Sequence, residues 1–94
     1  MKLLVTGNIT KGFASWVQMQ DGLAPEMEKV GIKLIWAGTN PDESEVFAVI
    51  EMEDPAQMKT FGEREDVAKI RVDGGVDGAS TKSISLIGED YLSD

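Results

Sequence analysis

Hydrophobic positions recur with two different periods along this chain, and the changes of period divide it into strands and helices. The segment from Leu3 to Ile9 is short and partly β-branched, which predicts a first strand that ends at the weak helix formers 10–12. From Phe13 to Val30, apolar residues recur at three- and four-residue steps. This spacing predicts an amphipathic helix, which Gly31 terminates.

Pro25 interrupts the pattern of this first helix. A proline has no N–H to donate to the carbonyl four residues earlier, here that of Asp21, and its ring crowds the same carbonyl. Gly22 loosens the same turn. We therefore expect a kink or break between Gly22 and Pro25.

The middle of the chain has the pattern of a β-hairpin. Ile32 to Thr39 and Val46 to Met52 are rich in β-branched and aromatic residues, and the turn-forming run from Asn40 to Ser44 separates them. We expect these two strands to pair in antiparallel fashion.

A second helical region begins at the run Asp54-Pro55-Ala56-Gln57. It offers an N-cap carboxylate, a proline at the first helical position and a glutamine at the third, which resembles a capping box. The apolar side of this helix, with Met58 and Phe61, is interrupted by the polar residues 63–66 before Val67 resumes it. The pattern favours two short helices over one long one.

The end of the chain predicts a last strand. Glycines in the stretch 74–78 predict a flexible connection, Lys82 to Ile87 predicts the strand, and a polar tail from Gly88 to Asp94 follows. The order strand, helix, strand, strand, helix, strand is that of an α+β ferredoxin-like sandwich, with helices on one face of a four-stranded antiparallel sheet. We expect residues 1–94 to form one such domain.

Both faces of this sheet carry apolar residues, although the helices suffice to cover one. Strict alternation predicts Val46, Ala48, Ile50 and Met52 on one face of the third strand and Phe47 and Val49 on the other. For the second strand it predicts Ile32, Leu34 and Trp36 opposite Ile35 and Ala37. A second copy of the same sheet would cover the extra apolar face, so we expect a homodimer that forms through it.

Composition excludes several classes of function. The 94 residues include 17 acidic and 9 basic side chains, a net charge of −8 that disfavours nucleic acid and anionic membrane surfaces as partners. The chain has no Cys and no His, so it lacks disulfides, a thiolate nucleophile, and the commonest acid/base group and metal ligand; we expect no metal site. Three apolar residues in a row after Lys2 are too few for a signal-peptide core, which predicts a cytoplasmic protein.

These features together resemble the dimeric α+β-barrel superfamily. The resemblance covers nearly the whole chain and rests on the element order, on the aromatic-rich first helix around Phe13 and Trp16, and on the stretch from Glu53 to Val76. It implies two ferredoxin-like sheets packed into one barrel, and a small ligand held between sheet and helices. Cofactor-free monooxygenases of antibiotic biosynthesis, haem-degrading monooxygenases and muconolactone isomerases belong to this superfamily, so the resemblance indicates the fold more sharply than the function. Without a histidine to ligate haem, we expect no cofactor.

The resemblance implies four candidate ligand-binding residues, Asn8, Trp16, Trp36 and Tyr91, and no identifiable catalytic residue. Three of them have a structural alternative that the sequence leaves open. Trp16 fits the apolar stripe of a helix, Trp36 fits a sheet interface, and Asn8 fits the turn chemistry at a strand end.

Three functions therefore remain open. The first is a homodimeric barrel that binds a small hydrophobic or aromatic metabolite. The second is a cofactor-independent monooxygenase or isomerase that acts on an aromatic, quinol-type or lactone substrate, with Asn8 and Trp36 orienting it. The third is a protein-interaction module whose extra apolar face meets a different protein, and which is a monomer in isolation.

Overall fold

A computed structural model describes residues 1–91 of the chain. The elements follow the predicted order: β1 (Lys2–Asn8), α1 (Gly12–Lys29), β2 (Ile32–Thr39), β3 (Glu45–Met52), α2 (Pro55–Glu63), α3 (Glu65–Asp73), a single 3-10 turn (Gly78–Ser80) and β4 (Lys82–Ile87). The polar tail predicted for 88–94 is described as far as Tyr91, and its last three residues lie outside the described part.

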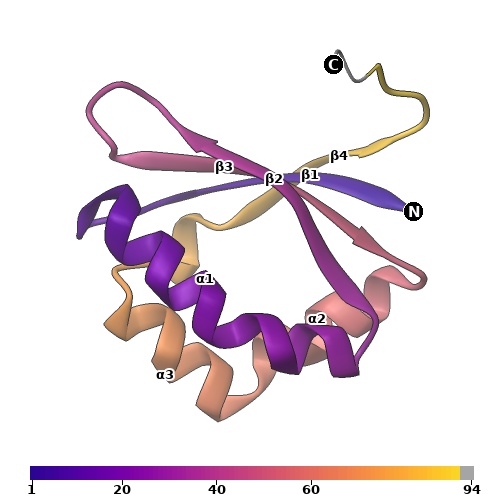
Figure 1. The fold of residues 1–94 in the computed structure, drawn as a ribbon, viewed down its shortest axis with the longest axis horizontal. Coiled ribbons are helices and arrows are strands. Elements are labelled where there is room, and N and C mark those ends of the chain that lie inside the picture. Colours follow the sequence, from indigo (N-terminus) through magenta and orange to yellow (C-terminus); the bar gives the residue numbers. More distant parts are fainter. Residues whose placement is uncertain (92–94) are drawn as a thin grey trace.

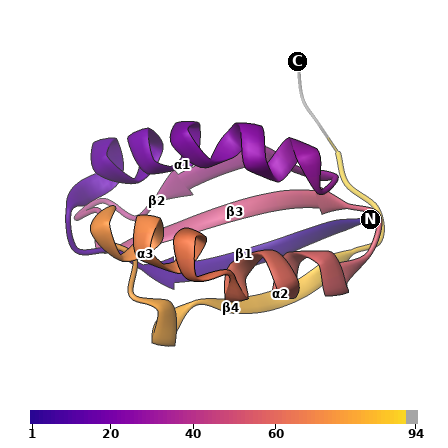
Figure 2. The same ribbon diagram turned by 90° about the horizontal axis from the view of Figure 1, so that it is seen from below.

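The strands form one antiparallel sheet in the order β2-β3-β1-β4. All the helices lie on the same side of it, with α1 beside a row made of α3 and α2, and the other side is bare within the described residues (Figures 1 and 2). The predicted α+β ferredoxin-like fold and the predicted antiparallel hairpin of β2 and β3 are confirmed.

The core lies between the sheet and the helices. On β3 the alternation predicted from the sequence is confirmed: Val46, Ala48, Ile50 and Met52 are buried beneath the helices, and the residues between them are half-buried. The helix α1 contributes a buried stripe at three- and four-residue spacing: Trp16, Met19, Leu23 and Met27. Burial of these apolar side chains is the main stabilising term of the fold.

The expected placement of Trp36 beside Ile32 and Leu34 is wrong. Leu34 pairs with Ile50 and Trp36 with Val49, so Ile35 is an extra residue in β2, a β-bulge that shifts the alternation by one. Trp36 therefore lies on the bare face of the sheet with 55% of its surface exposed, and Ala37 packs against the core instead.

Of the kink or break expected between Gly22 and Pro25, the break does not occur, because α1 is one helix from Gly12 to Lys29. Pro25 removes one backbone hydrogen bond, but the carbonyl it leaves belongs to Asp21, whose exposed position lets water replace the lost donor. Leu23 and Met27, on either side of the proline, are both buried and hold the helix against the sheet.

The second helical region is divided at Arg64, as the sequence predicts. Arg64 has extended backbone (φ −62°, ψ 133°), which ends α2 and starts α3. The cap at the start of α2 is simpler than the capping box that the sequence resembles. The Asp54 carboxylate accepts from the backbone N–H of Ala56 at 2.9 Å, and the Gln57 side chain makes no bond to Asp54.

The glycine-rich stretch after α3 is closely packed, contrary to the flexible connection that we predicted. At Gly74 a β-carbon would lie 2.8 Å from the side chain of Met19, and Gly75 has a φ of +92°, a conformation that favours glycine. Beyond them, Val76 forms a β-bridge with Ile9, and the Asp77 N–H donates to the Asn8 carbonyl at 3.0 Å. The stretch thus ties the end of α3 to the end of β1.

Candidate functional site

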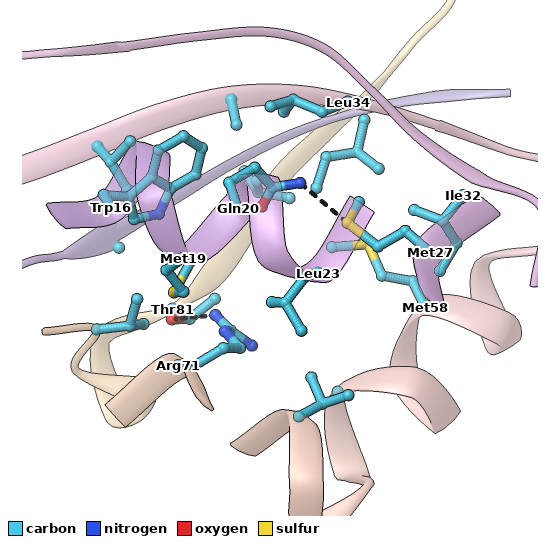
Figure 3. Close-up of a pocket in the computed structure, with 18 of the residues that line it drawn as sticks. Trp16, Met19, Gln20, Leu23, Met27, Ile32, Leu34, Met58, Arg71 and Thr81 are labelled. Atoms are coloured by element: carbon cyan, nitrogen blue, oxygen red, sulfur yellow. Dashed lines mark hydrogen bonds between the residues drawn. The ribbon is translucent and has the colours of Figure 1, made fainter. Parts of the chain in front are cut away.

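A cavity of about 100 Å³ lies between the sheet and the helices. Its walls are mostly apolar side chains from α1, the two central strands, α2 and α3, and Figure 3 shows several of them facing one another across it. The apolar walls include Trp16, Leu23, Ile50, Phe61 and Val67. Apolar walls with a few polar groups are typical of a site for a small organic molecule.

Gln20 is one of the few polar side chains at this cavity. Its side-chain amide donates to the sulfur of Met27 at 2.9 Å, along the cavity-facing side of α1 (Figure 3). A thioether is a weak acceptor, so this bond competes poorly with a better acceptor. The Gln20 amide is therefore available to a ligand.

Arg71 and Thr81 form a second polar group at the cavity wall, beside Met19 in Figure 3. One terminal nitrogen of the Arg71 guanidinium, Nη2, donates to the Thr81 hydroxyl at 3.3 Å. Partial burial lowers the pKa of Arg71, because it removes water from the charged group. Even so, a guanidinium remains protonated in proteins, so the cavity has a fixed positive charge at one end.

A wider groove of about 640 Å³ adjoins the cavity along α1 and the outer strand β2. The two spaces share Gln20, Met27, Ile32 and Leu34 in their walls. These four residues therefore stand between the interior cavity and the outer groove. A ligand longer than the cavity could extend past them.

Trp16 is the member of the predicted set that lines this cavity. It is 7% exposed, and its ring stacks on Phe13 with the centroids 5.7 Å apart and the planes 9° from parallel. The burial of Trp16 follows from its position in the apolar stripe of α1, which is visible in the sequence.

The structure places the other three predicted residues outside the cavity wall. Asn8 is exposed at the end of β1, where its backbone N–H donates to the Ser80 hydroxyl at 2.7 Å. Trp36 lies on the bare sheet face, and Tyr91, after β4, is 87% exposed. The structure thus does not gather the four residues at one site.

Sequence reasoning missed Arg71, Thr81 and Gln20. A signal existed for Arg71, because it follows the buried Val67 by four residues and so occupies the same face of α3. A cation within an apolar stripe does not register in a pattern of hydrophobic positions alone. Thr81 lies before β4 and reaches the cavity through tertiary packing alone.

Searches for other kinds of site give few candidates. Within residues 1–91, no three carboxylates gather in a way that could hold a metal ion. The same residues include no helix that is long and apolar enough to cross a membrane.

Two solved structures have the same fold as this chain. No family model and no curated protein matches the sequence. A proposed antibiotic biosynthesis monooxygenase from Deinococcus radiodurans superposes with a TM-score of 0.63 at 9% identity, over 100% of both chains. An L-rhamnose mutarotase from Formosa agariphila superposes with a TM-score of 0.60 at 18% identity, over 99% of both chains.

The chain has the ferredoxin-like α+β fold of these two proteins. The resemblance to dimeric α+β-barrel proteins is thereby confirmed at the level of the fold. The two neighbours are named for different activities, a monooxygenase of antibiotic biosynthesis and an L-rhamnose mutarotase, so the fold alone does not select a reaction.

Proposed function

We propose that this protein binds a small, mainly apolar molecule in the cavity between its sheet and helices. The observation that carries the proposal is the cavity itself, about 100 Å³ of space with mostly apolar walls in a chain of 94 residues. Close packing is the rule in protein interiors, and an engineered apolar cavity of roughly 150 Å³ is enough to bind benzene. The cavity here has about two-thirds of that volume, so a group the size of one ring fits it if the flexible methionines in its wall shift.

The outer groove supports a ligand that extends beyond one ring. Because Gln20, Met27, Ile32 and Leu34 line both spaces, rotation of the flexible Gln20 and Met27 side chains would join them. The buried part of the ligand is then held by apolar contact, and the Gln20 amide offers it a hydrogen bond.

The enzyme alternative is a cofactor-independent monooxygenase or isomerase, and the structural neighbours favour it because both are named for catalysis. In this alternative Trp16 would lie against the substrate, since it is the predicted residue at the cavity. Oxygen consumption with quinol-type substrates tests the oxidative form of this alternative. If the Trp16→Phe variant turns over substrate as fast as wild type, Trp16 has no specific role in the reaction.

The bare sheet face supports the homodimer. Strand register places Leu4, Trp36, Phe47 and Val49 together on it, and the indole of Trp36 lies flat over Gly38, where a β-carbon would be only 2.8 Å from the ring. An exposed apolar patch of this kind marks an interaction surface. A second copy of the same face is the partner that we propose, and a different protein is the alternative.

Light scattering after size exclusion tests the partner. A homodimer has a mass near twice 10.2 kDa, and Trp36→Glu should convert it to a monomer because it places a charge within the apolar face. Val72→Glu is the matched control, since Val72 is 63% exposed on α3, in the helical layer. A monomeric wild-type protein would contradict the homodimer and favour the interaction module.

An NMR titration tests the cavity. The chain has two tryptophans, so the indole N–H signals separate the buried Trp16 from the surface Trp36, and Trp36→Phe assigns them. With methyl benzoate as a neutral probe, we expect the Trp16 signal to shift in a saturable way. A shift confined to Trp36, or none at either tryptophan, would refute binding in the cavity.

A further inference from the structure

Arg71 is a cation that faces an apolar cavity from the end of α3. Figure 3 shows its guanidinium beside Thr81, at the end of the cavity near Trp16 and Met19 and away from Met27 and Ile32. Long cationic side chains at protein surfaces usually extend their charge into water. Arg71 is instead partly buried, on the same helical face as Val67, which is 1% exposed.

This cation has no carboxylate partner within residues 1–91, although the chain has 17 acidic residues. Arg64 shows the usual arrangement: its guanidinium donates to both oxygens of Asp66, at 3.1 and 2.7 Å, and lies 3.7 Å from Glu26. Charged groups that lose water on folding are normally paired. Arg71 therefore has the desolvation cost of a buried cation without the compensating anion.

Neighbouring residues orient the Arg71 guanidinium and leave most of its donors free. Nη2 donates to the Thr81 hydroxyl, which in turn donates to the Asp77 carbonyl at 3.3 Å. Gly7 makes room for this hydroxyl, because a β-carbon there would lie 3.0 Å from it. These contacts fix one nitrogen of the planar group.

Apart from the bond of Nη2 to Thr81, the guanidinium makes no hydrogen bond to residues 1–91. Gly62 lies next to Nη1 of Arg71 and has no side chain to cover it. A β-carbon added at position 62 would lie 3.9 Å from this nitrogen. No fully buried polar side-chain atom within residues 1–91 lacks a hydrogen-bond partner. Each nitrogen of Arg71 that makes no hydrogen bond therefore keeps some solvent-exposed surface.

We propose that Arg71 binds the carboxylate of the cavity's ligand, so that the ligand is a small carboxylic acid whose apolar part fills the cavity. A guanidinium matches a carboxylate through two parallel N–H···O bonds, and such charge-assisted bonds are stronger where water is partly excluded. The apolar walls next to Arg71 then accept a ring or a short aliphatic chain. This inference rests on the proposed binding function and specifies its ligand class.

Benzoate and methyl benzoate are the matched probes, since they share a ring and differ in charge. In a buffer without carboxylates, we expect wild-type protein to bind benzoate at least about tenfold more tightly than the ester. Arg71→Gln should remove that preference, so that the two probes bind with about equal affinity. Lys69→Gln is the control, because Lys69 is an exposed cation on the same helix and its loss makes the same change in net charge.

The outcomes separate this inference from the proposed function. If the ester binds and benzoate binds no more tightly, the role of Arg71 is refuted while the cavity stands as a binding site. If neither probe binds, both proposals fail. Inorganic phosphate that shifts the Trp16 signal as strongly as benzoate would overturn the carboxylate class.

A second variant keeps the test open if Arg71→Gln does not fold. Thr81→Val retains the charge of Arg71 and removes the hydroxyl that orients it. We expect the preference for benzoate over the ester to fall a few-fold. Equal losses for both probes would indicate a change in the cavity itself and would contradict the positioning role of Thr81.

Discussion

Ala48→Val tests whether the cavity is real space that the protein keeps open. Ala48 is 3% exposed on the central strand β3, and its side chain forms part of the cavity wall. Valine adds two carbons there, and the cavity of about 100 Å³ has room for them. Each buried carbon stabilises by about 0.8 kcal/mol, so the free energy of unfolding should rise by roughly 1.6 kcal/mol. For a domain of this size that corresponds to an increase in Tm of roughly 6–13 °C.

The control for this substitution is Ala37→Val. Ala37 pairs directly with Ala48 across β2 and β3 and is not among the residues that line the cavity. Both substitutions replace alanine by valine in one cross-strand pair, so a gain in stability at position 48 that is absent at position 37 indicates filling of the cavity.

Urea unfolding followed by tryptophan fluorescence measures the change in stability, and the methyl benzoate titration measures binding. We expect Ala48→Val to be more stable than wild type and to bind the probe at least about tenfold more weakly, because a methyl group occupies the ligand's place. A variant that is less stable, by the 1–3 kcal/mol typical of overpacking, and that binds the probe normally would refute the reasoning.

Three further predictions concern the scaffold. Asp54→Ala should lower the free energy of unfolding by about 1 kcal/mol in urea titrations, because α2 loses the 2.9 Å bond of its N-cap. Gly75→Ala should lower the free energy of unfolding by about 1–3 kcal/mol, because residue 75 has a φ of +92° and a β-carbon there would lie 2.9 Å from a backbone nitrogen. Gly78→Ala is the control and should be nearly neutral, because no atom lies within contact distance of its β-carbon. In an NMR pH titration the Asp66 pKa should lie below 3.8, because Arg64 donates to its carboxylate, and Arg64→Gln should raise it toward 3.8. Because the Asp66 pKa is lower in the folded state, the pair with Arg64 stabilises the folded protein at pH values above 3.8, and this stabilisation is lost as the pH falls through the lowered pKa. An Asp66 pKa that does not change in Arg64→Gln would contradict the pairing.

The order and type of the elements followed from the sequence alone. Hydrophobic periodicity, the Asp54-Pro55 helix start and the polar interruption at 63–66 are local signals, and each was enough to place a boundary within one or two residues. The fold class followed from that order because few topologies accommodate it.

Tertiary structure decided the face on which Trp36 lies and the continuity of α1. The bulge at Ile35 depends on the register between β2 and β3, and strict alternation carries no information about an extra residue. Likewise, Pro25 is tolerated because the buried Leu23 and Met27 hold the helix on both sides of it. Packing between distant segments outweighs a local preference of a few kcal/mol.

The candidate site belongs almost wholly to the tertiary structure. The sequence suggested Trp16 through the stripe of α1, but the cavity exists only where α1, β3 and α3 meet. Arg71 and Thr81 are ten residues apart and come together because the close-packed glycines 74 and 75 return the chain from α3 toward β1. The effect of a charged side chain depends on its surroundings. The sequence shows only that Arg71 lies near the end of a helix, whereas the fold shows that Arg71 faces an apolar cavity and has no carboxylate partner within residues 1–91.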